Sequence, residues 1–166
     1  MKTNALRWAK EIALYLLLAI AITTAVDIYR SQHVPMDIAP DLVGYDQNGE
    51  MVDVVEMSYE SPVVVYFWAT WCSVCRFVSP TVDWVSQYYP VVAVSGASGA
   101  SARVDAFKAA KGYQFPNIND ENSSLFRQWG ITVTPTIFIV KDGTIQSITT
   151  GITTPPGLLI RLWLNQ

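Results

Sequence analysis

The segment Trp68-Ala69-Thr70-Trp71-Cys72-Ser73-Val74-Cys75 constrains this chain more than any other. An uninterrupted apolar run, residues 63–67, precedes it and a helix-compatible segment follows, so the sequence predicts a strand that delivers two cysteines to a helix N-terminus. Unpaired backbone N–H groups and the helix dipole at that position favour a thiolate over a thiol. We therefore predict that Cys72 is an exposed, activated nucleophile and that Cys75 resolves a mixed disulfide formed on Cys72. An inert structural disulfide or two buried thiols are the alternatives for an isolated pair at this spacing.

A wider set of motifs resembles the thioredoxin superfamily. Trp68-Ala69-x-Trp71-Cys72-x-x-Cys75 stands as it does in that family, Pro80 follows as in the kinked helix of thioredoxin, and Thr134-Pro135-Thr136 precedes an apolar strand. Gly151 after the last strand also matches. From about Ala39 onward the chain is similar to the membrane-anchored TlpA and ResA branch, and within it to the ScsD-type proteins of the suppressor-of-copper-sensitivity cluster.

The resemblance implies a fold, a chemistry and a substrate-binding surface. The fold would be α/β and thioredoxin-like, with a central mixed sheet flanked by helices and an N-terminal β-hairpin. The chain would be an enzyme, a protein thiol–disulfide oxidoreductase that needs no cofactor. Thr134 and Pro135 would form a cis peptide bond beside the dithiol and, with Trp71, would contact the substrate. A trans proline at the start of a strand is the alternative.

The hydrophobic pattern is consistent with this fold, because strand-like and helix-like segments alternate and then give way to a hairpin with Asp-Gly at its turn. The predicted elements are a hairpin of 41–45 and 51–54, strand 63–67, helix 73–88, strand 91–94, helix 102–111, strand 115–118, helix 123–129, strands 136–140 and 145–150, and helix 155–164. Residues 56–61 are predicted as a polar connection with at most one helical turn. Asp120-Glu121-Asn122 precedes a helix and is predicted to cap it rather than to bind a metal.

The N-terminal segment is predicted to be a transmembrane signal-anchor. Residues 12–26 carry no charge, although a helix of that length rises only about 22 Å against a hydrocarbon core of about 30 Å. The span must therefore include Trp8, Ala9 and Ile28, while Lys10 extends toward the interface. A cleaved signal peptide is the alternative.

Charges on both sides of the span predict its orientation, and the span separates the chain into parts. The N-terminus is basic, so the positive-inside rule keeps it in the cytoplasm and exports the rest. We expect a single-pass protein of the bacterial inner membrane with its catalytic domain in the periplasm. The predicted parts are residues 1–29 as cytoplasmic tip and anchor, 30–40 as linker and 41–166 as the thioredoxin-like domain. His33 falls in the linker and is predicted to have no metal or acid–base role.

Composition limits the partners. The chain has only two cysteines and a formal net charge of −3, and it shows no basic patch, so nucleic acid is not an expected ligand. The resemblance, by contrast, implies cysteine-containing protein substrates and a membrane electron-donor protein, and the predicted N-terminal helix implies contact with the inner membrane. The direction of electron transfer is open, with a reductase or relay preferred.

The chain departs from the family at two positions. Thioredoxin carries a buried Asp where this chain has Tyr66, and the TlpA-like branch carries a Glu where this chain has Val78. Neither familiar proton acceptor for Cys75 is present. We therefore predict that resolution of the mixed disulfide is slow at neutral pH and sensitive to pH.

Two other function classes are alternatives for this chain. A Cu(I) chaperone could bind the metal through two thiolates, but a third soft ligand is expected and no His or Met accompanies the motif. A redox-inactive docking module is the other alternative, and the intact pair of cysteines argues against it. We predict no metal site.

Overall fold

The computed structural model describes Trp8, residues 10–15, Leu18 and residues 38–165. The chain divides into two units, Met1–Gln32 and His33–Gln166, and the described residues of the first are helical. Most of the predicted membrane span and linker lies outside the described residues, so the anchor, His33 and the domain boundaries stay predictions. Among the described residues, no helix combines the length and apolar character needed to cross a membrane.

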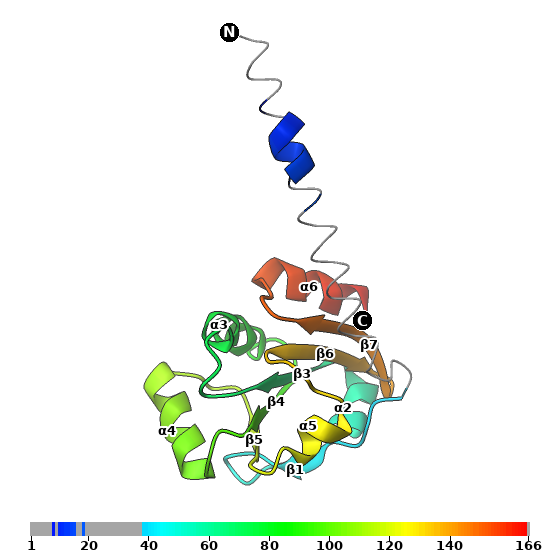
Figure 1. Cartoon of the computed structure of the whole chain (residues 1–166). Helices are drawn as coiled ribbons and strands as arrows, with labels where there is room; N and C mark the ends of the chain where they lie inside the picture. Colours follow the sequence, from blue (N-terminus) through cyan, green and yellow to red (C-terminus); the bar gives the residue numbers. More distant parts are fainter. Residues whose placement is uncertain (1–7, 9, 16–17, 19–37, 166) are drawn as a thin grey trace. The chain divides into compact units, whose positions relative to one another are not determined.

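The second unit has a two-stranded hairpin, β1-β2, and a five-stranded sheet in the order β5-β4-β3-β6-β7 (Figure 1). Its elements are β1 (Val43–Tyr45), β2 (Met51–Asp53), α2 (Val54–Glu60), β3 (Val63–Trp68), α3 (Cys75–Val85), β4 (Val91–Gly96), α4 (Ser101–Lys111), β5 (Asn117–Asp120), α5 (Ser124–Gln128), β6 (Thr136–Lys141), β7 (Thr144–Thr150) and α6 (Pro155–Leu164).

The sheet is mixed because its connections differ in length. Helices α3 and α4 carry the chain back between strands, so β3, β4 and β5 run parallel. A tight turn at Asp142-Gly143, both with positive φ, joins β6 to β7 antiparallel, and β6 also pairs antiparallel with β3. The predicted thioredoxin-like fold with a mixed central sheet is confirmed.

Strand β3 lies at the centre and is buried on both faces. Val64, Tyr66 and Trp68 pack in a core with buried residues of α3, α4 and α6. Val63, Val65 and Phe67 pack in the second core, on the opposite face, with residues of α2 and the β1-β2 hairpin. A strand covered by helices on both faces needs apolar residues at every position, which explains the uninterrupted apolar run in the sequence.

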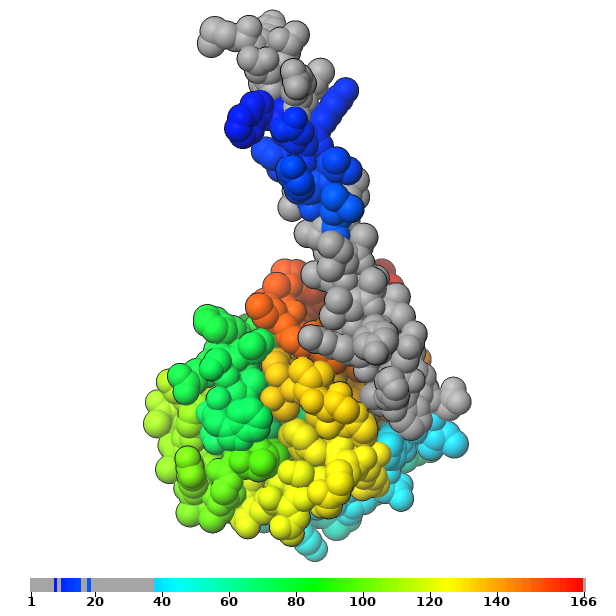
Figure 2. Space-filling model, in the orientation of Figure 1, coloured from blue at the N-terminus to red at the C-terminus, as the bar shows by residue number. Residues whose placement is uncertain are grey.

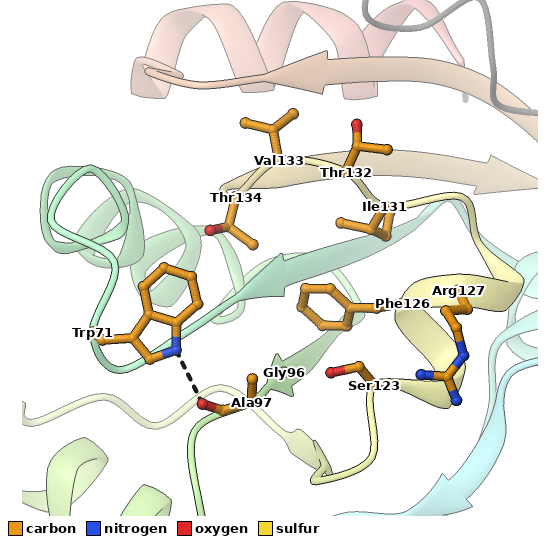
Figure 3. Close-up of a pocket in the computed structure, with 10 residues that line it drawn as sticks. All are labelled: Trp71, Gly96, Ala97, Ser123, Phe126, Arg127, Ile131, Thr132, Val133 and Thr134. Carbon is orange, nitrogen blue, oxygen red and sulfur yellow. Dashed lines mark hydrogen bonds between the residues drawn. The ribbon is translucent and has the colours of Figure 1, made fainter.

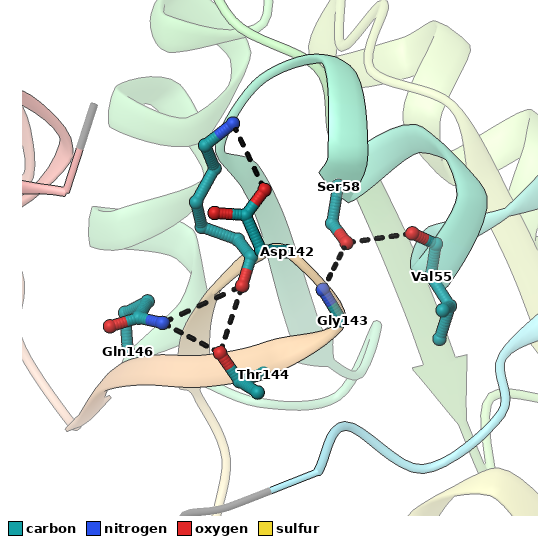
Figure 4. Close-up of polar contacts among 7 residues, drawn as sticks. Val55, Ser58, Asp142, Gly143, Thr144 and Gln146 are labelled. Atoms are coloured by element: carbon teal, nitrogen blue, oxygen red, sulfur yellow. Dashed lines mark hydrogen bonds and ion pairs between the residues drawn. The ribbon is translucent and has the colours of Figure 1, made fainter.

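The segment predicted as a polar connection is a helix, α2. The Asp53 carboxylate accepts the backbone N–H of Glu56 at 3.1 Å and so caps the first turn. Ser58 Oγ donates to the Val55 carbonyl at 2.7 Å and accepts the Gly143 N–H at 2.8 Å (Figure 4). The helix therefore holds the β6–β7 turn, a long-range role that the polar sequence of this segment does not reveal.

Several element boundaries also differ from the prediction, and the starts of β5 and α3 have a structural reason or consequence. Strand β5 begins at Asn117 rather than at Phe115, because Pro116 has no N–H to donate and contributes only its carbonyl, which accepts from Ala93 N at 2.9 Å. Helix α3 begins at Cys75 rather than at Ser73 and contains Pro80. Cys72 therefore lies ahead of the first helical turn.

Candidate active site

Cys72 and Cys75 form a disulfide at the junction of β3 and α3, with their Cα atoms 5.3 Å apart. The Cys75 backbone N–H donates to Cys72 Sγ at 3.1 Å. This N–H belongs to the first turn of α3 and has no partner within the helix, so it can stabilise negative charge on Cys72 when the disulfide is reduced. The predicted arrangement of strand, dithiol and helix N-terminus is confirmed.

The prediction that Cys72 is exposed is wrong for the oxidised protein. Cys72 is 6% exposed and Cys75 is 1% exposed. The bond to Cys75 and the N–H···S contact hold the Cys72 sulfur against the helix, while Trp71, Ser73 and Val74 around it are exposed. Cys72 is still the more accessible sulfur of the two.

A loop that follows β4 holds the residues before Cys72 in place. Ser98 Oγ accepts the Thr70 N–H at 3.0 Å, and the Ala97 carbonyl accepts the Trp71 indole N–H at 3.0 Å. Trp68 is fixed separately, since its indole N–H donates to Asn117 Oδ1 at 2.8 Å. Sequence reasoning assigned no role to the small residues that follow β4 and missed that they position Trp71.

The Thr134–Pro135 peptide bond is cis, as the resemblance implied. Pro135 is buried, and its carbonyl accepts the N–H of Gly151, which has φ +79. Thr134 is partly exposed.

Trp71 and Thr134 line the same groove, which has a volume of about 310 Å³. Trp71 lies on one side of it and Phe126 on the other (Figure 3). The remaining lining residues are Gly96, Ala97, Ser123, Arg127, Ile131, Thr132 and Val133. In the space-filling view the segment that contains α5 (yellow) borders the segment that contains α3 (green) (Figure 2). The structure thus brings two of the three predicted substrate-binding residues, Trp71 and Thr134, into one groove.

A second, much narrower space lies on the inner side of the disulfide and has no room for a water molecule. Its walls include Cys72, Cys75, Ser79 and Tyr113. Ser79 Oγ is 2.9 Å from the hydroxyl of Tyr66, and both residues are buried. Burial raises the pKa of Tyr66 and also that of Tyr113, since both phenolates would lose their hydration.

Ser79 was missed by sequence reasoning, although one signal was present. It lies four residues after Cys75, and residues at this spacing occupy the same face of a helix. Val78, the position at which the TlpA-like branch has a Glu, is fully buried and does not line this space.

No group of His, Cys, Asp and Glu among the described residues is arranged to hold a metal ion. The residues around the space beside the disulfide include neither His nor Met, so the Cu(I) alternative gains no third ligand there. Asp120 caps a helix, as predicted. Its carboxylate accepts the backbone N–H groups of Ser124 at 2.8 Å and Phe126 at 3.0 Å.

Comparisons with known proteins agree with this geometry. A thioredoxin-like protein of Haemophilus influenzae is 33% identical over 148 residues, which cover 89% of this chain and 88% of the relative. The thiol-disulfide oxidoreductase ResA of Bacillus subtilis is 27% identical over 122 residues, covering 70% of this chain and 67% of ResA. The crystal structure of a thiol:disulfide interchange protein of the thioredoxin family from Chlorobium tepidum superimposes with a TM-score of 0.66 at 20% identity, covering 79% of this chain and 97% of that chain. The model of the AhpC/TSA family matches residues 35–148, which is more than half of the sequence, and the chain therefore belongs to the AhpC/TSA family.

Proposed function

We propose that this thiol–disulfide oxidoreductase exchanges disulfides with cysteine-containing protein partners, in the manner of ResA. The observation that carries the proposal is the Cys72–Cys75 disulfide at the start of α3, directly after Trp71, which lines a groove together with Thr134. A structural disulfide would need neither a groove beside it nor a helix N–H directed at one sulfur.

The reduced protein would transfer two electrons to its partner in two steps. The Cys72 thiolate attacks one sulfur of the partner disulfide, which forms a mixed disulfide and releases the other partner sulfur as a thiolate. The Cys75 thiolate then attacks Cys72 Sγ, which forms the intramolecular disulfide and releases the second partner sulfur. The partner is reduced and the protein is oxidised.

The geometry supports Cys72 as the attacking sulfur. Cys72 precedes the helix, accepts the Cys75 N–H and is the more accessible of the pair. Cys75 is enclosed by the first turn of α3, so a partner disulfide can reach it only after Cys72 has reacted. This order matches the roles predicted from the sequence.

The groove provides a surface for the partner. An extended segment could lie beside Thr134 and place its cysteine above Cys72, with a side chain between Trp71 and Phe126. Phe77, Val74 and Trp71 are exposed near the disulfide, at 75%, 37% and 62% of their surface, and would bury apolar area on contact with a partner. An exposed apolar surface formed by these three side chains supports binding to a protein rather than to glutathione alone.

We further propose a reductase of the membrane-anchored ScsD type, held at the bacterial inner membrane with its catalytic unit in the periplasm and linked to copper tolerance or cytochrome c maturation. The basic N-terminus and the uncharged residues 12–26 support the anchor, and the motif resemblance supports the ScsD type. A reductase that is oxidised in each cycle needs a supply of electrons, so a membrane electron-donor protein is part of the proposal.

Trapping experiments with single cysteine variants test the exchange reaction. Cys75→Ala should accumulate a mixed disulfide on Cys72, because the resolving thiol is absent, whereas Cys72→Ala should trap almost none. Mass spectrometry of the trapped species would also identify the partner. Equal yields from the two variants would contradict the assigned roles.

The direction of transfer is tested by rapid alkylation of thiols in cells. A reductase should be found mainly as the dithiol, and loss of a membrane electron donor should shift it to the disulfide. A protein that is mostly oxidised regardless of the donor would instead be an oxidase.

A further inference from the structure

We propose that the Ser79 hydroxyl, oriented by Tyr66, donates a hydrogen bond to the Cys75 thiolate and thereby takes the place of the missing carboxylate. The inference rests on the proposed function, because it concerns the resolving step of disulfide exchange. Ser79 would act on the reacting sulfur directly, and Tyr66 would be a positioning residue.

The first argument is location. Ser79 lies one helical turn after Cys75 on α3, and the two residues share the walls of the narrow space beside the disulfide. Ser79 is 1% exposed and the space holds no water, so solvent does not compete for its hydroxyl. A thiolate on Cys75 would need a donor at this position, since an unpaired charge that is buried is costly.

The second argument is the direction of the hydrogen bonds. The hydroxyls of Tyr66 and Ser79 lie 2.9 Å apart and either can be the donor; Tyr66, whose pKa burial raises, is neutral and can donate to Ser79 Oγ. The Ser79 proton is then available to a second acceptor, for which the Tyr113 hydroxyl, another hydrogen-bond partner of Ser79, and the Cys75 sulfur compete. In the oxidised protein Cys75 carries no charge, but reduction creates a thiolate, and a hydrogen bond to the charged form lowers the pKa of a thiol.

Other charged and titratable groups around the space do not replace this donor. Arg76 on α3 and Tyr113 after α4 line it, and Tyr66 reaches Ser79 from β3. The Arg76 charge favours a thiolate but the side chain is exposed, so solvent screens it. Burial raises the pKa of Tyr113, a hydrogen bond with Ser79 opposes this rise, and Asp83 adds to it. Asp83 does not line the space, and no carboxylate does.

The chemical step balances without a further co-reactant. Cys75 loses its proton to solvent while the mixed disulfide is still intact. Its thiolate then forms the bond to Cys72 Sγ, the bond to the partner sulfur breaks, and the partner leaves as a thiolate that takes up a proton. Ser79 supplies only a hydrogen bond, which strengthens as charge develops on Cys75.

The test uses the full chain with Ser79→Ala, Tyr66→Phe and the control Thr81→Ala, which removes another buried hydroxyl from α3 that does not line the space. The rate of resolution of a glutathione mixed disulfide on Cys72 is measured between pH 6 and 9. Ser79→Ala should move the pH profile upward by about one unit and slow resolution near pH 7 about 10-fold. Tyr66→Phe should shift it less, and Thr81→Ala not at all.

A second readout separates a hydrogen bond from a loss of structure. The thiolate absorbance of Cys75 is titrated in Cys72→Ala with and without Ser79→Ala, and the pKa of Cys75 should rise when the hydroxyl is removed. An unchanged pKa and pH profile, or an equal shift in Thr81→Ala, would overturn the inference while exchange by the wild type stands. If the wild-type protein forms no mixed disulfide at all, it is the proposed function that fails.

Discussion

Replacing Gly96 by alanine should destabilise the protein and narrow the groove. Gly96 is the last residue of β4, and a Cβ built on it would lie 2.5 Å from Cε2 and Cζ of Phe126. Atoms do not approach that closely, so the ring must move. It is held by an edge-on contact with Phe67, at 5.2 Å between centroids, and by the Phe126 N–H, which donates to Asp120. The groove that Phe126 lines offers space into which the ring can move.

The expected cost follows from overpacking. Inserting a methyl group into a packed site that can relax only in part typically costs about 1–3 kcal/mol. Gly44→Ala is the matched control, because its Cβ would meet the flexible end of Ile118 at 3.0 Å and the side chain can give way. We expect that variant to lose less than about 1 kcal/mol.

Urea unfolding measures the cost, with an unchanged m-value as the sign that only stability has changed. Phe126→Leu and the double variant Gly96→Ala/Phe126→Leu complete a cycle, in which the shorter side chain should recover about 1 kcal/mol or more of the loss. The KM for a protein disulfide should rise in Gly96→Ala, while reduction of the Cys72–Cys75 disulfide by dithiothreitol should not change. A variant as stable and as active as the wild type would refute both the packing and the groove arguments.

Further predictions concern proton transfer, capping and pH. Val78→Glu should speed resolution near neutral pH in stopped-flow assays, because it supplies a carboxylate as proton acceptor. It should also lower the stability, because it places a carboxyl group at a fully buried position. No gain in rate would mean that another group already stabilises the Cys75 thiolate or accepts its proton. Asp120→Ala should cost about 1–3 kcal/mol in urea unfolding, because two N–H groups of α5 lose their acceptor, whereas the exposed Glu121→Ala should stay within about 0.5 kcal/mol. Tyr66 has a folded pKa above the unfolded value of 10.0, so its contribution is fully present below pH 10 and is lost as the pH rises further. The difference in unfolding free energy between wild type and Tyr66→Phe should therefore be constant up to about pH 10 and fall by about 1.4 kcal/mol per pH unit above it, and a difference still constant at pH 11 would contradict the assignment.

The sequence by itself determined the features that follow from local pattern. An apolar run without interruption predicted the strand β3, and the two cysteines after it predicted a dithiol at a helix start. The cis bond before Pro135 came from the resemblance and is confirmed, although no periodicity could have revealed it. The membrane anchor rests on sequence alone and stays a prediction.

Only the tertiary structure decided which residues meet around the disulfide. Trp71 reaches the Ala97 carbonyl across 26 positions of sequence, and Tyr66 reaches Ser79 across 13. Hydrophobic periodicity reports which face of an element is buried, but not which buried neighbour it meets, because that depends on how strands and helices pack. The pattern therefore predicted that a carboxylate is missing beside Cys75, while the fold showed that Ser79 and Cys75 line the same narrow space and that Tyr66 contacts Ser79 there.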